Sequence, residues 1–173
     1  MLRNLFAVKD RLISGYPGTA EISLALERRE VDGRCGWSWT SIKAEKSIWL
    51  AEKKLNLIVQ LALEKAHDLP DVPLIIDLAR SDQQKQILKL IFSRQTMGRP
   101  FVAPPNIPSD RRDALRAAFD ETMRDPAFLA EAEKNKIEIN PVNGVEIEAL
   151  MEDLYRTPAD VVAQARKAVE GSH

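Results

Sequence analysis

Cysteine and histidine are scarce in this sequence of 173 residues. The single cysteine, Cys35, rules out an internal disulfide, and two histidines give zinc no ligand set. No apolar run approaches the length of a membrane span. A net charge of -1 gives no reason to expect nucleic acid or an anionic membrane as partner. The whole sequence is 45% hydrophobic and 29% charged, which is typical of a globular protein with a core.

An enzyme built on these scarce residues is one alternative. Cys35 and His67 are the only candidates for a thiol and imidazole pair, with Asp32 or Asp68 to orient the ring. His67 lies in a polar segment, however, and nothing in the sequence brings it near Cys35. We therefore expect a buried structural thiol and a solvated histidine, and predict no enzyme, no cofactor and no metal.

Residues 14–21 (Ser-Gly-Tyr-Pro-Gly-Thr-Ala-Glu) organise the N-terminal half of the chain. Residues 11–14 are short, apolar and bounded by turn residues, which predicts a buried strand. The two glycines allow a tight turn, and Thr19 is the predicted N-cap of a helix with Glu21 in its first turn. Free amides from Thr19 to Ile22 then favour a carboxylate or a phosphate. The alternative is an ordinary connection from strand to helix.

The apolar pattern predicts an α/β fold with a mixed sheet flanked by helices. Residues 31–36 indicate a second strand. Residues 55–63 indicate the strongest one, because nearly continuous apolarity suits a strand covered on both faces. Residues 137–141 predict a further short strand. Between them, residues 41–53 predict one or two short helices.

Prolines divide the middle of the chain. Residues 74–79 predict a short helix, and residues 81–97 a longer one that Ser81 caps, with Gln84 completing a capping box. The extended segment 100–105 is the predicted boundary between a first domain, 1–99, and a mainly helical second domain, 100–173. Helices are predicted there over 109–124 (capped by Ser109), 128–136, 144–155 and 157–169, before a tail at 171–173.

Several of these motifs, in this order, resemble the tripartite tricarboxylate transporter receptor family, also called Bug-type solute-binding proteins. The similar segments extend over nearly the whole chain. They are residues 15–21 (GYPGTAE), 24–28 (LALER), 30–33 (EVDG), 68–74 (DLPDVPL), 97–105 (MGRPFVAPP) and the region from Pro126 through Gly144.

The resemblance implies the C-terminal portion of a two-lobed periplasmic binding protein with a partial type II-like fold. Residues 1–99 would be part of lobe two, and residues 100–173 the crossover and the helices that pack on lobe one. A small carboxylate would be the ligand, and the transporter's membrane subunits the partners. Trp37 or Trp39 would form either a wall of the cleft or part of the core. The implied ligand-binding residues are Gly15, Tyr16, Pro17, Gly18, Thr19, Gly36, Trp37 and Ser38.

The chain also departs from the family pattern. Family members are periplasmic and carry an export signal and a first lobe before the motif, whereas residues 1–10 lack a signal pattern, so we expect a cytoplasmic chain as written. Half a cleft cannot bury a ligand, so we expect weak or lost binding. The C-terminal helices would then pair with a second copy in a homo-oligomer. The alternative function is a truncated remnant that folds and self-associates without ligand.

A second departure concerns the end of the motif helix. Arg29 stands where the family usually has glycine, the residue that suits a left-handed helix ending. A side chain in that conformation costs about 1 kcal/mol, or the helix ends in another way.

Overall fold

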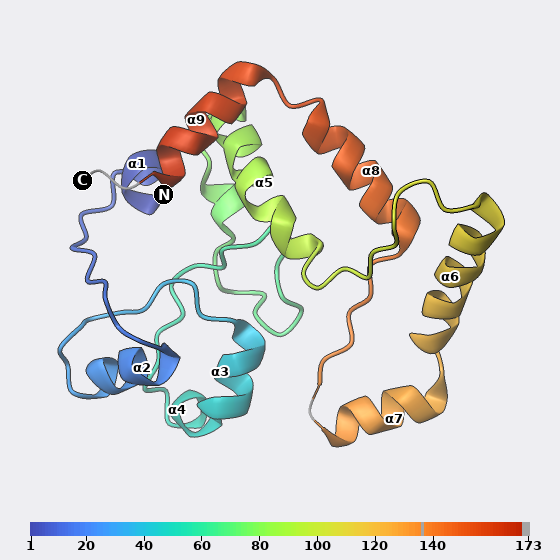
Figure 1. Cartoon of the computed structure of the whole chain (residues 1–173). Coiled ribbons are helices and arrows are strands. Elements are labelled where there is room, and N and C mark those ends of the chain that lie inside the picture. Colours follow the sequence, from blue (N-terminus) through green and yellow to red (C-terminus); the bar gives the residue numbers. More distant parts are fainter. Residues whose placement is uncertain (136, 171–173) are drawn as a thin grey trace. The chain divides into compact units, whose positions relative to one another are not determined.

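The computed structural model describes residues 1–135 and 137–170, which form two compact units. The first unit contains residues 1–56 together with the chain from Lys167 onward, and the second contains Leu57–Arg166. Figure 1 shows the helices of both units in chain order. The predicted tail, 171–173, and residue 136 of a predicted helix lie outside the described residues. The domain boundary at residue 99 stays a prediction.

The predicted mixed sheet, and with it the α/β fold class, is wrong. The described chain is 54% helical with only 1% strand and forms no sheet. The four predicted strands, 11–14, 31–36, 55–63 and 137–141, are irregular segments, apart from one parallel bridge between Gln60 and Leu74. A strand forms only where a neighbour takes its hydrogen bonds, and an apolar run does not show whether that neighbour exists. Ile58, in the most apolar run, is 79% exposed.

The first unit is built from short helices. They are α1 (Leu2–Phe6), α2 (Thr19–Glu27), α3 (Trp39–Glu45) and α4 (Ser47–Ala51), so the prediction of short helices over 41–53 is confirmed. Asn4 on α1 donates from Nδ2 to the carbonyl oxygens of Lys167 and Ala168, at 3.2 and 3.1 Å. This side chain therefore satisfies carbonyl groups at a helix end, which have no partner within their own helix.

Helix α2 ends in a left-handed turn at Arg29. The φ of Arg29 is 60°, its N–H donates to the Leu26 carbonyl (3.1 Å), and the Glu30 N–H donates to the Ala25 carbonyl (2.9 Å). These two bonds form a Schellman ending, in which glycine is the usual left-handed residue. The helix thus has the left-handed ending that usually takes glycine, with an arginine in that position.

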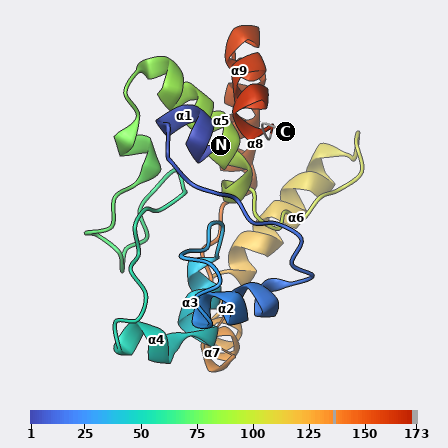
Figure 2. The same cartoon turned by 90° about the vertical axis from the view of Figure 1, so that its left-hand side faces the viewer.

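The second unit has its core beside helix α5. Its elements are η1 (Ile75–Leu78), α5 (Asp82–Thr96), α6 (Ser109–Thr122), α7 (Pro126–Lys134), α8 (Gly144–Tyr155) and α9 (Ala159–Val169), whose last turn belongs to the first unit. Figure 1 and Figure 2 both show α9 beside α5. The buried apolar residues of this core are Leu74, Ile75, Ile76, Ile87, Leu88, Phe92, Val161 and Ala165.

Sequence signals at helix ends agree with most of these bounds. Ser81 Oγ accepts a hydrogen bond from the Gln84 N–H at 3.1 Å, which confirms the predicted cap of α5. Asn143 forms a capping box with Glu146 at the start of α8. The predicted cap of α6 is displaced by one position, because Pro108 precedes the first helical residue, Ser109.

Gln60 organises the irregular chain that precedes η1. Its side-chain Nε2 donates to the carbonyl oxygens of Leu69 and Val72, both at 2.9 Å, and its Oε1 accepts from the Ala66 N–H at 2.8 Å. Its backbone N–H donates to the Pro73 carbonyl at 2.8 Å, and its carbonyl accepts from the Ile75 N–H at 2.9 Å. One amide side chain therefore holds three backbone groups of residues 66–72, next to the core at Leu74.

Candidate functional site

The predicted anion-binding turn leads directly into α2. Gly15 has a φ of 101°, a left-handed conformation that favours glycine, and Gly18 is the N-cap with extended backbone. The cap was predicted one residue later, at Thr19, which is instead the first helical residue. Because Gly18 has no side chain, it cannot cap the first amides of α2 as serine or aspartate would.

The carboxylate of Glu21 lies at this helix start. A Cβ built on Gly18 would lie 2.8 Å from Oε2 of Glu21, so the side chain folds back beside the N-cap. A negative charge is favourable there, because the first amides of the helix carry partial positive charge. The chain's own carboxylate therefore lies where a bound anion was predicted, and any ligand must compete with it.

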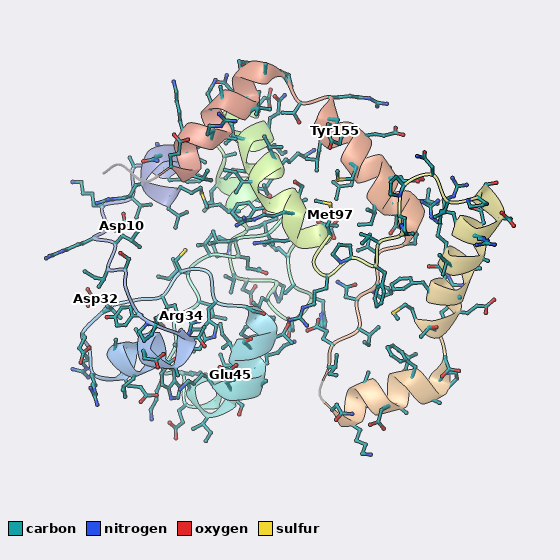
Figure 3. All side chains as sticks on the ribbon, viewed as in Figure 1. Asp10, Asp32, Arg34, Glu45, Met97 and Tyr155 are labelled. Atoms are coloured by element: carbon teal, nitrogen blue, oxygen red, sulfur yellow. The ribbon has the colours of Figure 1, made fainter. Side chains whose placement is uncertain are left out.

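Arg34 connects this turn to the second predicted loop. Its Nη1 donates to the Thr19 carbonyl at 3.3 Å and to Ser23 Oγ at 3.2 Å, while Ser23 itself donates to the Thr19 carbonyl at 3.0 Å. The guanidinium lies 4.2 Å from the centre of the Trp37 ring. Figure 3 shows Arg34 next to α2. Arg34 thus brings the first turn of α2 and the loop 36–38 together.

Trp37 is packed rather than open to a ligand. Its ring meets that of Trp49 edge to face, with centroids 6.4 Å apart, and Arg34 covers it. Lys46 lies 4.2 Å from the Trp49 ring centre and pairs with Glu27 on α2 at 3.1 Å. Such cation contacts stabilise aromatic rings at partly exposed sites. Trp37 therefore links the loop to α2 and α4.

The remaining predicted binding residues lie around this cluster. Gly36 has a φ of 75°, and Ser38 is the exposed N-cap of α3. Tyr16 is partly buried and Pro17 exposed. A shallow hollow between α2 and α3 lies nearby, lined by Ala20, Ser23, Leu24, Glu27, Glu45 and Lys46. None of the eight predicted binding residues lines that hollow. The structure thus brings the two loops together, and the hollow beside them is lined by other residues.

Sequence reasoning missed Arg34. The only signal for it was its position in a short loop between two glycines, Gly33 and Gly36, and arginines in loops are common on protein surfaces. Its role depends on the fold of the loop against α2, which the linear pattern does not show.

The residues considered for enzyme chemistry are both at the surface. Cys35 is exposed, so the expectation of a buried thiol is wrong, whereas the expectation of a solvated His67 is confirmed. Cys35 belongs to the first unit and His67 to the second. Over residues 1–135 and 137–170, no group of three or more His, Cys, Asp or Glu side chains could hold a metal ion. No helix in the same residues is long and apolar enough to cross a membrane.

Comparison of the chain with family models, curated proteins and solved structures finds no match. The similarity of residues 15–33 to the Bug-type motif therefore stays a prediction made from the residues alone.

Proposed function

We propose that this chain is a portion of a solute-binding protein for carboxylate uptake by a tripartite tricarboxylate transporter, and that the ligand's carboxylate binds at the start of α2. The motif of residues 15–33 and one contact support the proposal. Arg34 lies against the first turn of α2, with Nη1 3.3 Å from the Thr19 carbonyl. A guanidinium adds a full positive charge to the partial charge of the helix amides.

The position of Glu21 indicates how a ligand would bind. Its carboxylate folds back beside Gly18, so a carboxylate fits sterically and electrostatically at this helix start. Within the described residues, Arg34 uses only Nη1 for its hydrogen bonds to α2, which leaves its other N–H groups for an external acceptor. A ligand would displace the Glu21 side chain and accept from those N–H groups. The exposed site predicts weak binding, with a Kd of about 1 mM or higher.

Nuclear magnetic resonance on the full chain tests this function. We expect succinate, nicotinate or glutamate to shift the backbone amide signals of residues 19–21. Replacement of Arg34 by methionine should abolish those shifts, because it removes the charge but keeps an apolar chain beside Trp37. Arg28→Met is the matched control, because Arg28 is exposed at the other end of α2. Amides that do not respond to tens of millimolar ligand would refute the function, and micromolar binding would refute the argument that the open site binds weakly.

A second candidate function, self-association without ligand, is favoured by the crossing segment. Phe101 and Val102 are 88% and 86% exposed, and Phe101 contacts only one ring, that of Phe119, at 5.7 Å among the described aromatic residues. Large apolar residues this exposed favour a protein contact. Sedimentation should detect a dimer that Phe101→Asp weakens and Ile58→Asp, at another exposed apolar position, does not. A monomer at high protein concentration would exclude this candidate.

A further inference from the structure

The dipeptide Asn143–Gly144 stands at the start of helix α8 and has a chemistry of its own. Of the asparagines in the chain, only Asn143 precedes a glycine. The side-chain amide of an asparagine is open to attack by the backbone nitrogen of the next residue, because the attack closes a five-membered ring. Glycine has no Cβ to hinder that approach, so among the asparagines of this chain Asn143 has the least hindered attacking nitrogen.

The capping box of α8 holds the Asn143 side chain away from this reaction. Its Oδ1 accepts hydrogen bonds from the N–H groups of Val145 and Glu146, at 3.0 and 2.9 Å, and its own N–H donates to Glu146 Oε2 at 3.3 Å. The ψ of Asn143 is 163°, an extended value. Ring closure requires Cβ and the Gly144 nitrogen to be eclipsed about the Cα–C bond, so the backbone must rotate and the cap must open first.

The start of α8 is a place where such opening is easy. Among the residues of α8, each of which the structure describes, none is fully buried, and the hydrogen bonds of the cap are exposed. Local opening at a low free energy is typical of helix ends that have few buried apolar contacts. Water also reaches an exposed cap, so the two requirements of the reaction, transient opening and water, are both met.

From this geometry we propose that Asn143 is a site of spontaneous deamidation and that the capping box of α8 controls its rate. The Gly144 nitrogen gives its proton to water and forms a bond to Cγ of Asn143. The bond from Cγ to Nδ2 breaks, and Nδ2 takes up a proton and leaves as ammonia. Water then cleaves one C–N bond of the ring: cleavage at Cγ gives aspartate, and cleavage at the backbone carbonyl gives isoaspartate. No group is oxidised or reduced.

The two products change the start of α8 in opposite ways. Aspartate keeps an acceptor at the N-cap and adds a negative charge at a helix start, where negative charge is stabilising. A cation lies close by, because Nε of Arg116 would be 2.6 Å from a Cβ built on Gly144. Isoaspartate instead adds a carbon atom to the main chain, so the geometry between the cap and the N–H groups of Val145 and Glu146 is lost. Modification therefore either strengthens the start of α8 or releases it.

Peptide mass spectrometry of the full chain, incubated at mildly alkaline pH, tests the site. We expect Asn143 to deamidate at least about tenfold faster than Asn56, an exposed asparagine that precedes leucine. A synthetic peptide with the sequence of residues 139–148 is too short to keep a stable helix start. In that peptide the same asparagine should react about tenfold faster than in the folded chain, because no cap protects it.

Two substitutions of Glu146 in the full chain separate the cap from the intrinsic reactivity of the dipeptide. Glu146→Ala removes the acceptor for the Asn143 N–H and should speed deamidation about fivefold, because the loss of one hydrogen bond raises the open population. Glu146→Gln is the matched control, since glutamine also completes a capping box, and its rate should stay within about twofold of the wild type. Circular dichroism should show the same helix content in both variants, because Glu146 is exposed.

Equal deamidation of Asn143 and Asn56 would overturn the modification site. Equal rates in the peptide and the folded chain, or in the two Glu146 variants, would overturn the control by the cap. Hydrogen exchange at the amide of Glu146 tests the products: protection should persist in Asn143→Asp and be lost in the isoaspartate form separated by chromatography, and any other pattern would overturn their opposite effects. No ligand takes part, so the outcome is independent of carboxylate binding at α2.

Discussion

Replacement of Gln60 by glutamate tests whether one side chain holds the irregular chain of the second unit. The change keeps the size of the side chain and the acceptor Oε1 for the Ala66 N–H, which it binds at 2.8 Å. It removes Nε2, the donor to the Leu69 and Val72 carbonyls at 2.9 Å each. A carboxylate oxygen would then face two carbonyl oxygens, so repulsion is added to two lost hydrogen bonds.

The expected loss follows from those contacts. Each hydrogen bond contributes about 0.5–1.5 kcal/mol, and partly buried carbonyls without a donor add a desolvation penalty. We expect Gln60→Glu to lower the free energy of unfolding by about 2–4 kcal/mol at pH 7. Urea unfolding followed by circular dichroism measures this loss, and hydrogen exchange at the amides of Ala66 and Ile75 locates it.

The loss should depend on pH with a definite sign. Carbonyl oxygens beside the new carboxyl favour its protonated form, so the folded variant has a glutamate pKa above the unfolded value of about 4.3. Stability relative to the wild type is then greatest below pH 4 and falls as the pH rises from about 4.3 through the folded pKa. Gln86→Glu, on the exposed face of α5, is the control. Equal stabilities for the two variants at pH 7, within about 0.5 kcal/mol, would refute the reasoning.

Three further changes test other parts of the structure. Arg29→Gly should raise the free energy of unfolding by about 1 kcal/mol, because glycine adopts the left-handed backbone conformation of this position without strain. Arg28→Gly should lower the free energy of unfolding, because Arg28 has a right-handed backbone conformation. Urea unfolding compares the two variants. The hydrogen bond and the charge of Arg116 lower the pKa of Glu148. The ion pair is therefore intact above the ordinary carboxyl pKa, and it is lost as the pH falls through the lowered pKa of Glu148. Arg116→Met should return the Glu148 pKa to its usual range, which a carbon-detected NMR titration measures. Glu21→Gln should tighten succinate binding at α2 several-fold by removing the internal competitor, and unchanged amide titrations would contradict that role.

Helices could be predicted from the sequence because their signals are local. Ser81, Asp125 and Asn143 are capping residues, and each precedes a helix whose first amides it satisfies. The sheet could not be predicted correctly because strand pairing is not local. Residues 55–63 have the composition of a buried strand, but among them only Gln60 forms a β-bridge, to Leu74. The side chain of Gln60 donates its hydrogen bonds to the following loop.

The candidate site was predictable to the same extent. Of the two glycines of the predicted turn, Gly15 has a positive φ, as glycine in a tight turn favours, whereas Gly18 is extended, and the start of α2 was placed to within one residue. Two features of the site depend on how a long side chain is oriented in three dimensions. The Glu21 carboxylate lies beside Gly18, and Arg34 contacts Thr19 and Ser23. No spacing in the sequence carries that information.

All three tryptophans of the chain lie in the first unit, at positions 37, 39 and 49. The edge-to-face contact of Trp37 and Trp49, with Arg34 and Lys46 over their rings, should give this pair a strong near-ultraviolet dichroism and quenched emission. Tryptophan emission therefore reports on the first unit alone, whereas far-ultraviolet dichroism reports on the helices of both units. A melt of one unmodified sample followed by both signals would show directly whether the two units unfold together.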